Sequence, residues 1–301
     1  MLIVSPRRSP NLMFQHPPTM LLLLLLTLPL YTLAWGTLGH RTVAYLSSLY
    51  FTPEATRFTN HLLNGQDISE ASLFPDKVRY IPSFHYTAPW HYIDARDDPP
   101  RQCGINITRD CLSNGCVVSA IANHTERVMN KDLPHWARGQ SLRFLVHFIG
   151  DVHQPLHTEN EDRGGNEIPV LFDRRHTNLH SVWDTLIPNK HAAGENETEA
   201  AFLWAQKLYA EDPGPDNSME DKCQDLNDIE GCALAWAADA NKWVCEYVLK
   251  DDIEGLQGDL GGEYYDGAVP IIDEMVAKGG RRLGAWLNRM VKDMELVVQE
   301  L

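Results

Sequence analysis

The sequence has no excess of positive charge. Its 301 residues include 41 acidic and 26 basic side chains, and the formal net charge at pH 7 is −15. Proteins that follow nucleic-acid phosphates over a broad surface are usually basic. The composition therefore argues against such a surface, and a nucleic acid bound by this chain would have to be held locally, by metal ions and a few side chains.

Long apolar runs are scarce as well. The run Met20–Leu30 is shorter than the ~20 residues that cross a bilayer. Two arginines precede it, and small residues occupy the −3 and −1 positions of a cleavage site after Ala34. We therefore expect residues 1–34 to be a secretory signal peptide and the mature chain to begin at Trp35, with no stable membrane association. Because the removed segment contains two arginines and no acidic residue, the formal net charge changes from −15 to −17.

The few cysteines are confined to the expected mature chain. All six follow Trp35, which fits an oxidising compartment. Six cysteines allow fifteen pairings, and the sequence does not choose among them. Glycosylation sequons begin at Asn106, Asn123 and Asn196. Together these features indicate a secreted, extracellular glycoprotein with disulfide bonds.

Linkers and internal repeats are also lacking, so we expect residues 35–301 to form one domain. Strand signals are few: the alternation over Glu167–Phe172, after a glycine-rich stretch, predicts a small hairpin. The fold is predicted to be mainly α. Apolar residues at helical spacing predict helices over Arg41–Tyr50, Pro53–Leu63, Val117–Lys131, Ser141–His153, Glu197–Ala210, Cys232–Leu249 and Val269–Leu296.

Two common catalytic motifs are missing, namely the zinc-protease helix signature and the Gly-x-Ser-x-Gly nucleophile elbow. Histidine and aspartate recur at four-residue steps instead. The stretch FLVHFIGDVHQPLH contains His147 and Asp151, and NLHSVWD contains His180 and Asp184. Residues four apart share one helix face, where an imidazole and a carboxylate can bind one metal ion. A single such pair is more often a capping or surface pair, but two pairs indicate a metal site.

Three further residues extend this pattern. His157 follows the first pair beyond a proline, His91 lies in WHYID, and Asp76 lies in LFPDKVRY. Histidine nitrogens and carboxylate oxygens are the usual ligands of zinc where cysteine is absent. His153 lies two residues after Asp151, on another face of the helix, and is expected to be a packing residue or a partner of a ligand.

The motifs together resemble the S1/P1 nuclease family in their order and spacing. The resemblance covers the mature chain from Trp35 to near its C-terminus. It implies a mostly α-helical fold shared with bacterial zinc-dependent phospholipase C. It also implies a secreted endonuclease that hydrolyses phosphodiester bonds in single-stranded DNA and RNA to 5′-phosphate products, with 3′-nucleotidase activity. The motifs that carry it are WGTLGH, FPDKVRY, WHYIDA, FLVHFIGDVHQPLH, RGGN and NLHSVWD.

The resemblance implies three Zn²⁺ ions. The first would be held by Asp76, His91, His147 and Asp151, and the second by His157, His180 and Asp184. The third would be held by His40, by Asp151 as a bridge, and by the backbone nitrogen and oxygen of Trp35. Only a free α-amine, with a pKa near 8, can serve in this way, so cleavage after Ala34 would create a ligand.

The resemblance also assigns roles around the metal site. Asp151 would take part in catalysis as the bridging ligand, and Arg79 would neutralise charge on the transferred phosphate. Tyr92 would stack on a base, and Asp94 would accept hydrogen bonds from the edge of that base. Asn166, in the Gly-Gly-Asn loop, is a candidate donor to the substrate, with a turn-forming role as the alternative. We expect the protein to be a monomer.

The resemblance implies disulfides Cys103–Cys245 and Cys111–Cys116, and Cys223–Cys232 follows as the remaining pair. Two other functions stay open at this point. A zinc-dependent phospholipase C would need an apolar rim facing lipid and no base-stacking pair. A non-enzymatic secreted zinc-binding protein would keep the ligands without catalysis.

Overall fold

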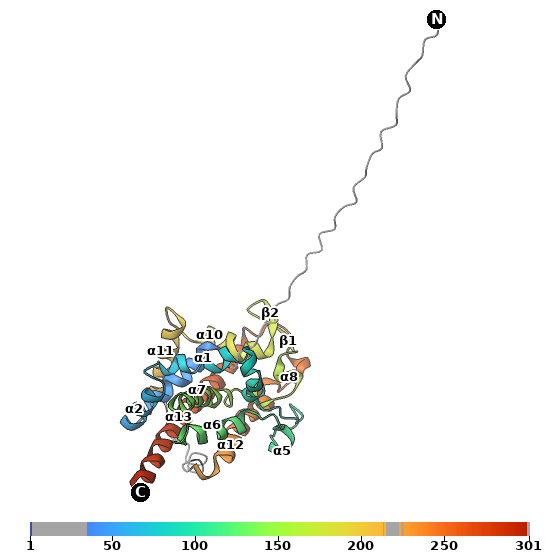
Figure 1. Ribbon diagram of the computed structural model, residues 1–301. Helices are drawn as coiled ribbons and strands as arrows, with labels where there is room; N and C mark the ends of the chain where they lie inside the picture. Colours follow the sequence, from blue (N-terminus) through green and yellow to red (C-terminus); the bar gives the residue numbers. More distant parts are fainter. Residues whose placement is uncertain (2–34, 213, 215–222, 224–225, 300–301) are drawn as a thin grey trace. The chain divides into compact units, whose positions relative to one another are not determined.

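The structure of the chain is a computed structural model that describes residue 1 and residues 35–212, 214, 223 and 226–299 (Figure 1). The expected signal peptide, apart from residue 1, lies outside the described residues. None of the helices in the described part of the chain is long and apolar enough to cross a membrane.

The described residues are mainly helical, as predicted. The longer helices are α1 (Thr37–Leu49), α2 (Pro53–Leu62), α6 (Val117–Met129), α7 (His135–Asp151), α11 (Glu197–Glu211), α12 (Ile229–Trp243) and α13 (Glu263–Gln299). The short ones are α3 (Ile68–Ala71), α4 (Phe74–Val78), α5 (Ile107–Asp110), α8 (Asp162–Gly165), α9 (Leu179–Ser181) and α10 (Ile187–His191). The 3₁₀ turns are η1 (Pro82–His91), η2 (Pro155–Thr158), η5 (Leu226–Asp228) and η7 (Ile253–Gly255), and the π-helical turns are η3 (Val182–Leu186) and η6 (Val244–Val248).

Each of the seven predicted helices is present, and the largest differences in helix starts are at α7 and α13, which both begin six residues before the predicted start. For α13 the sequence pattern predicts a start at Val269. The structure starts the helix at Glu263 and carries it through Pro270. In the neighbouring turn, Tyr247 donates its hydroxyl to the carbonyl oxygen of Tyr264, which ties the added helical turn to η6.

The predicted hairpin is also present, shifted by two residues at its start. Strands β1 (Pro169–Phe172) and β2 (Arg175–Asn178) pair antiparallel, with Pro169 opposite Asn178. The two residues between the strands, Asp173 and Arg174, both have positive φ, as a tight two-residue hairpin turn requires.

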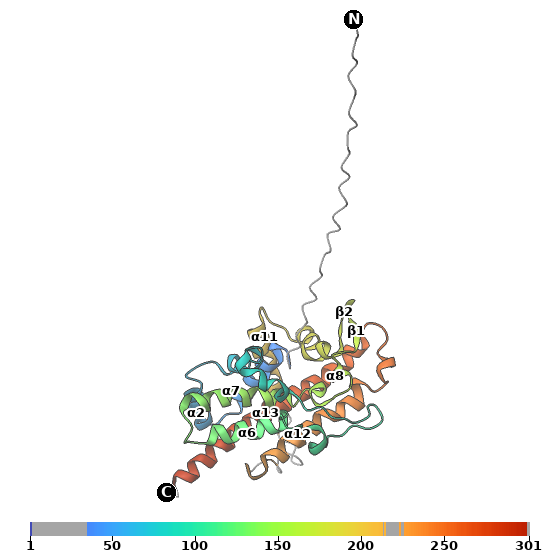
Figure 2. The ribbon, with the colours of Figure 1, turned by 45° about the vertical axis from the view of Figure 1, so that its right-hand side comes forward.

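Helix α7 lies at the centre of the folded region, between α1, α13 and α6 (Figures 1 and 2). Its second half is buried almost without interruption, and this explains why its apolar residues do not follow a single amphipathic stripe. Helix α1 packs against α11 and α13, and α6 packs against both α7 and α12. The central position of α7 places its C-terminal residues where several other elements end.

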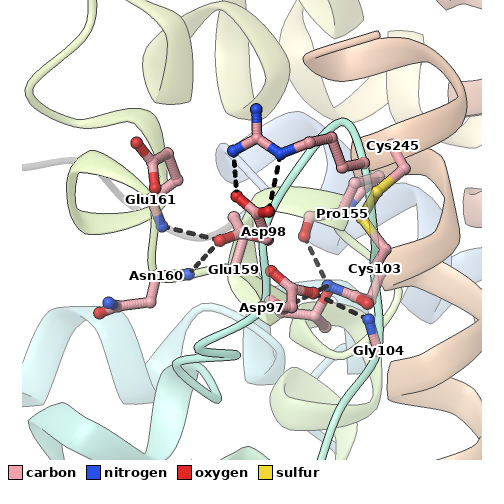
Figure 3. Close-up of a disulfide and its surroundings, with 12 residues drawn as sticks. Asp97, Asp98, Cys103, Gly104, Pro155, Glu159, Asn160, Glu161 and Cys245 are labelled. Atoms are coloured by element: carbon pink, nitrogen blue, oxygen red, sulfur yellow. Dashed lines mark hydrogen bonds and ion pairs between the residues drawn. A yellow bond between two sulfur atoms is a disulfide. The ribbon is translucent and has the colours of Figure 1, made fainter. Parts of the chain in front are cut away.

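Three disulfides join the expected pairs, Cys103–Cys245, Cys111–Cys116 and Cys223–Cys232. Figure 3 shows the first, which links two segments 142 residues apart. Beside it, the carboxylate of Glu159 accepts the backbone N–H groups of Asn160 and Glu161. Asp97 accepts the backbone N–H of Gly104, next to Cys103. The disulfide holds the loop after η1 against η6, and the hydrogen bonds fix the backbone of this loop and of the segment after η2.

Candidate metal centre

Asp151, the last residue of α7, lies at the centre of a group of histidines. Its side chain is completely buried. One oxygen, Oδ2, lies 3.0 Å from Nδ1 of His91 and 3.2 Å from Nε2 of His147. The other, Oδ1, lies 3.2 Å from Nε2 of His40. The i, i+4 spacing of His147 and Asp151 places both on one face of α7, as predicted.

His40 reaches this group from α1 because the two helices come very close together. Its ring stacks on His147 with centroids 3.9 Å apart. Opposite His40, α7 carries Gly150, where a Cβ atom would lie 2.9 Å from Nδ1 of His40. A side chain at position 150 would therefore push His40 away from Asp151.

Asp76 completes the first predicted ligand set. It comes from the short helix α4, and its Oδ1 lies 3.7 Å from Nδ1 of His91 and 3.8 Å from Nε2 of His147. These separations are too long for hydrogen bonds and leave room for an ion between the side chains. The structure therefore brings together all four residues of the set, Asp76, His91, His147 and Asp151.

The second predicted set, His157, His180 and Asp184, forms a neighbouring group. Nε2 of His180 lies 3.0 Å from Oδ2 of Asp184, and Nε2 of His157 lies 3.7 Å from Oδ1. Asp184 belongs to the π-helical turn η3, a rare geometry that often occurs at functional sites. His157 Nδ1 also lies 4.0 Å from Oδ1 of Asp151, so the two groups are adjacent.

Backbone carbonyl groups fix the orientation of three of the histidines. Nδ1 of His147 donates to Ser72 O (2.7 Å), Nδ1 of His157 to His91 O (2.7 Å), and Nδ1 of His180 to Gly164 O (2.6 Å). A proton on Nδ1 leaves Nε2 with its lone pair directed into the site. This arrangement is typical of metal-binding histidines.

The donor atoms of the site lack other partners. Seven buried atoms of the predicted side-chain ligands have no hydrogen-bond partner among the described residues: His40 Nδ1 and Nε2, Asp76 Oδ1, His91 Nε2, Asp151 Oδ1, His157 Nε2 and Asp184 Oδ2. Burying polar atoms without partners is costly, and for a carboxylate the cost is high. The donor atoms converge in three groups that could each hold a metal ion, and the nitrogen and oxygen donor set suits zinc.

The charges of the site follow from burial and from short histidine–carboxylate distances. Burial alone would raise the pKa of Asp151, but His147 and the neighbouring histidines outweigh it and hold this pKa far below its usual range. Burial alone would lower the pKa of His157, but Asp184 raises it to about 9. At His91 burial dominates and lowers the pKa to about 4. Buried carboxylates that stay ionised favour the binding of cations.

Trp35 lies beside the site with its side chain completely buried. The next backbone N–H, that of Gly36, donates to the carbonyl oxygen of Asp184 at 2.7 Å. This bond ties the backbone of Trp35 to the second ligand group. The Trp35 ring lies close to α7, because a Cβ atom at position 150 would be 4.0 Å from its Cδ1 atom. Its role as a ligand stays a prediction.

The glycine-rich loop shapes the approach to His180. Four consecutive residues, Asp162 to Gly165, have positive φ. At Gly164 a Cβ atom would lie 2.6 Å from the carbonyl oxygen of Leu156. Asn166 donates from Nδ2 to the carbonyl oxygen of Arg163, so it closes this turn. A contact between Asn166 and substrate stays a prediction.

The other predicted substrate residues line the same region. Arg79 is mostly buried, and its Nη1 lies 3.6 Å from Oδ1 of Asp76. Tyr92 follows the buried His91 directly and is 37% exposed. Asp94 is half-buried, and burial raises its pKa.

The sequence interpretation missed Gln154. Its completely buried amide donates from Nε2 to Oδ1 of Asp184 and accepts the backbone N–H of Leu156. The sequence offered one signal for this role, because Gln154 lies between the two predicted ligands Asp151 and His157. His153, expected to pack or to support a ligand, donates from Nδ1 to Ile149 O and accepts from Nη1 of Arg282.

Comparisons with known proteins agree with this geometry. The family model described as S1/P1 Nuclease matches residues 35–292. Nuclease S1 of Aspergillus oryzae is 39% identical over 274 residues, which cover 87% of this chain and 94% of that protein. Nuclease P1 of Penicillium citrinum is 39% identical over 264 residues, which cover 85% and 97%. Among solved structures, the alpha toxin from Clostridium absonum matches 88% of this chain and 66% of that chain, with a TM-score of 0.48 and 14% identity.

Proposed function

This chain belongs to the S1/P1 nuclease family, and we propose that it is a trinuclear zinc endonuclease acting on single-stranded DNA and RNA. The products would carry 5′ phosphates, and 3′-nucleotides would be substrates of the same site. The observation that carries the proposal is the convergence of buried, unpartnered nitrogen and oxygen atoms around Asp151 and Asp184. Residues 35–301 would form one catalytic domain, secreted after removal of residues 1–34.

Two of the zinc ions would be held by the groups already described, centred on Asp151 and on Asp184. The third would be held by His40, Asp151 and the free amino terminus of Trp35. When bound, zinc polarises phosphate oxygens and lowers the pKa of water enough to supply a nucleophile near neutral pH. Three ions and three ligand carboxylates leave a formal charge of about +3. This local charge would attract phosphate to a protein that is acidic as a whole.

The residues of the chain would orient the substrate around this centre. The guanidinium of Arg79, held beside Asp76, can donate to the phosphate oxygens that do not take part in bond breaking. Asp151 stays ionised in its buried position, so it would supply negative charge to the two ions that share it as a ligand. Since neither Asp151 nor Asp184 is protonated near neutral pH, neither is available as a general acid.

Base recognition would involve Tyr92 and Asp94. Tyr92 is partly exposed immediately after the ligand His91, so a base stacked on its ring would place its own phosphate near the metal centre. A base inside a duplex is already stacked and paired, so it offers no free face. Preference for single strands would follow from this requirement.

Secretion is supported by two structural observations. The three cysteine pairs are all joined as disulfides. Asn106, Asn123 and Asn196, the first residues of the three sequons, are all exposed. An attached glycan would therefore extend into solvent at each site.

The test uses the mature protein that begins at Trp35. Zinc per molecule is measured together with cleavage of matched single-stranded and double-stranded DNA, before and after chelation. About three zinc ions and chelator-sensitive cleavage of the single strand are expected. A choline-phosphate ester is the control substrate, because its rapid hydrolysis without DNA cleavage would contradict the nuclease and favour a phospholipase C. Full zinc loading without turnover of either substrate would contradict an enzymatic role.

A further inference from the structure

Arg79 has an aromatic neighbour, the last residue of FPDKVRY, to which neither the motifs nor the ligand sets assign a role. Nη2 of Arg79 donates to the hydroxyl oxygen of Tyr80 at 2.8 Å. The guanidinium carbon also lies 5.1 Å from the centre of the Tyr80 ring. Side chains of adjacent residues usually point away from each other. Here the Tyr80 side chain instead turns back, so that both its hydroxyl and its ring contact the Arg79 guanidinium. Tyr80 is 42% exposed, whereas Arg79 is mostly buried.

The contacts of the Arg79 guanidinium with Asp76 and with Tyr80 differ in kind. The contact with Asp76 joins opposite charges, but Nη1 and Oδ1 are 3.6 Å apart, which is too long for a hydrogen bond. The bond to Tyr80 has ordinary hydrogen-bond length. The hydroxyl contact gives the guanidinium a direction, whereas the contact with Asp76 supplies an opposite charge.

Tyr80 is itself held in place by its backbone. Its carbonyl oxygen accepts from Nε2 of His85 at 3.1 Å, within the turn η1. The following N–H, of Ile81, donates to the carbonyl oxygen of Val78 at 2.7 Å, which continues the last turn of α4. The same short segment carries Asp76 at its start and His91 at its end. These bonds fix the backbone of Tyr80 within the segment that carries Asp76 and His91.

We infer that Tyr80 is a positioning residue for Arg79, holding its guanidinium toward the metal centre before a phosphate arrives. This inference rests on the proposed function, in which Arg79 contacts the phosphate. An unrestrained arginine side chain has many rotamers, and fixing one of them only when substrate binds would weaken transition-state stabilisation. Donors that are already aimed at the developing charge avoid this loss.

The experiment is a double-mutant cycle in the mature, zinc-loaded protein. Tyr80→Phe removes the hydroxyl and keeps the ring, and Arg79→Met removes the charge. The third variant combines both. Each protein is measured for zinc per molecule, melting temperature, kcat and KM on a single-stranded oligonucleotide, and affinity for inorganic phosphate by calorimetry. Tyr86→Phe is the matched control, because it removes the hydroxyl of an exposed tyrosine of the same segment whose ring packs against Trp90.

Tyr80→Phe should lower kcat about 5-fold with little change in KM or zinc content, as expected for the loss of one hydrogen bond of average strength. Phosphate affinity should fall by a similar factor. In the Arg79→Met background the same substitution should change neither quantity, because the group that Tyr80 orients is gone. Tyr86→Phe should behave as the unaltered protein.

Three results would overturn the inference: unchanged kcat and phosphate affinity in Tyr80→Phe, an equal loss with and without Arg79, or a loss of zinc in Tyr80→Phe. The proposed function fails separately, if the zinc-loaded unaltered protein does not cleave single-stranded nucleic acid. In that case the phosphate measurement still decides the role of Tyr80, because it requires no turnover.

Discussion

The amide of Gln154 donates from Nε2 to Oδ1 of Asp184, in the interior between α7 and η3. The other amide atom, Oε1, accepts the backbone N–H of Leu156, so the amide cannot turn over without losing both bonds. This leaves Oδ2 of Asp184 facing His180, at 3.0 Å from Nε2. Gln154 therefore fixes the orientation of the Asp184 carboxylate between His157 and His180.

Replacing this amide should weaken metal binding at the His157, His180 and Asp184 group. Gln154→Met keeps the volume but cannot donate to Asp184, and affinity for one zinc ion should fall about 10- to 100-fold. Calorimetric zinc titration of the apo protein measures the effect. Gln206→Met, at an exposed position of α11, is the control. Equal zinc affinity in the two variants would show that Gln154 does not support the ligand.

Asp151→Asn should abolish cleavage and release at least one zinc ion. An amide has one oxygen and no charge, so it cannot serve two ions as the carboxylate would. Zinc per molecule and turnover of single-stranded DNA are the readouts. Asp132→Asn, at an exposed position before α7, controls for loss of a carboxylate elsewhere. A variant at position 151 that keeps both zinc and activity would contradict the bridging role.

Tyr92→Ala should weaken cleavage of single strands while zinc content stays the same. Stacking of one base on an aromatic ring contributes ~1–3 kcal/mol, so kcat/KM should fall by roughly 5- to 150-fold. Tyr92→Phe keeps the stacking face and should retain most of the activity. If the alanine and phenylalanine variants are equally active, the base is held elsewhere.

One additional glycine before Trp35 should remove a zinc ion and most of the activity. It converts the free α-amine into an amide, which cannot bind metal as an amine does. The backbone of Gly36 is tied to Asp184, so the extension cannot be absorbed by a shift of the chain. Two mature proteins, with and without the glycine, are compared for zinc and turnover. Equal values in both would make Trp35 a packing residue only.

A buried ionic network behind α7 should make stability depend on acid pH. Asp239 accepts from Nη2 of Arg282 and from Nζ of Lys278, both at 2.9 Å. Burial alone would raise the pKa of Asp239, but these cations outweigh it and hold this pKa far below its usual range. A carboxyl group whose pKa is lower in the folded state stabilises the protein above its unfolded pKa of about 4. That stabilisation is lost as the pH falls below this value.

Melting temperatures of the unaltered protein and Asp239→Asn between pH 7 and pH 2 test this claim. The variant removes the buried carboxylate charge that Arg282 and Lys278 share, so it should lose about 3 kcal/mol of stability at pH 7. The difference between the two proteins should narrow as the pH falls below 4. A difference that stays constant over the whole range would exclude Asp239 as the titrating group.

Much of the fold and of the site was predictable because it depends on local patterns. Helical spacing identified the seven long helices, and the four-residue steps of His147 with Asp151 and His180 with Asp184 placed these pairs on single faces. The acceptors of the histidine Nδ1 protons were not predictable. The carbonyl group of Ser72 lies 75 residues before His147, and any residue type has such a group. Partners of this kind follow only from tertiary packing.

The start of α13 was mispredicted for a related reason. Proline is expected in a first turn, and no local signal says that tertiary contacts will extend the helix past it. The hydrogen bond between Arg79 and Tyr80 also has no sequence signature. Neighbouring residues do not face each other in a regular helix, and this pair lies where α4 ends.

Gly150 makes α7 less stable but lets the predicted metal ligands His40 and Asp151 come together. Glycine is less favourable than alanine inside a helix by about 1 kcal/mol, yet it occupies the last turn of α7. An added methyl group would strengthen that turn and would also displace His40. The approach of His40 in α1 to Asp151 therefore depends on the absence of a Cβ atom at position 150. Selection for a more stable helix and selection for metal binding act in opposite directions at this position.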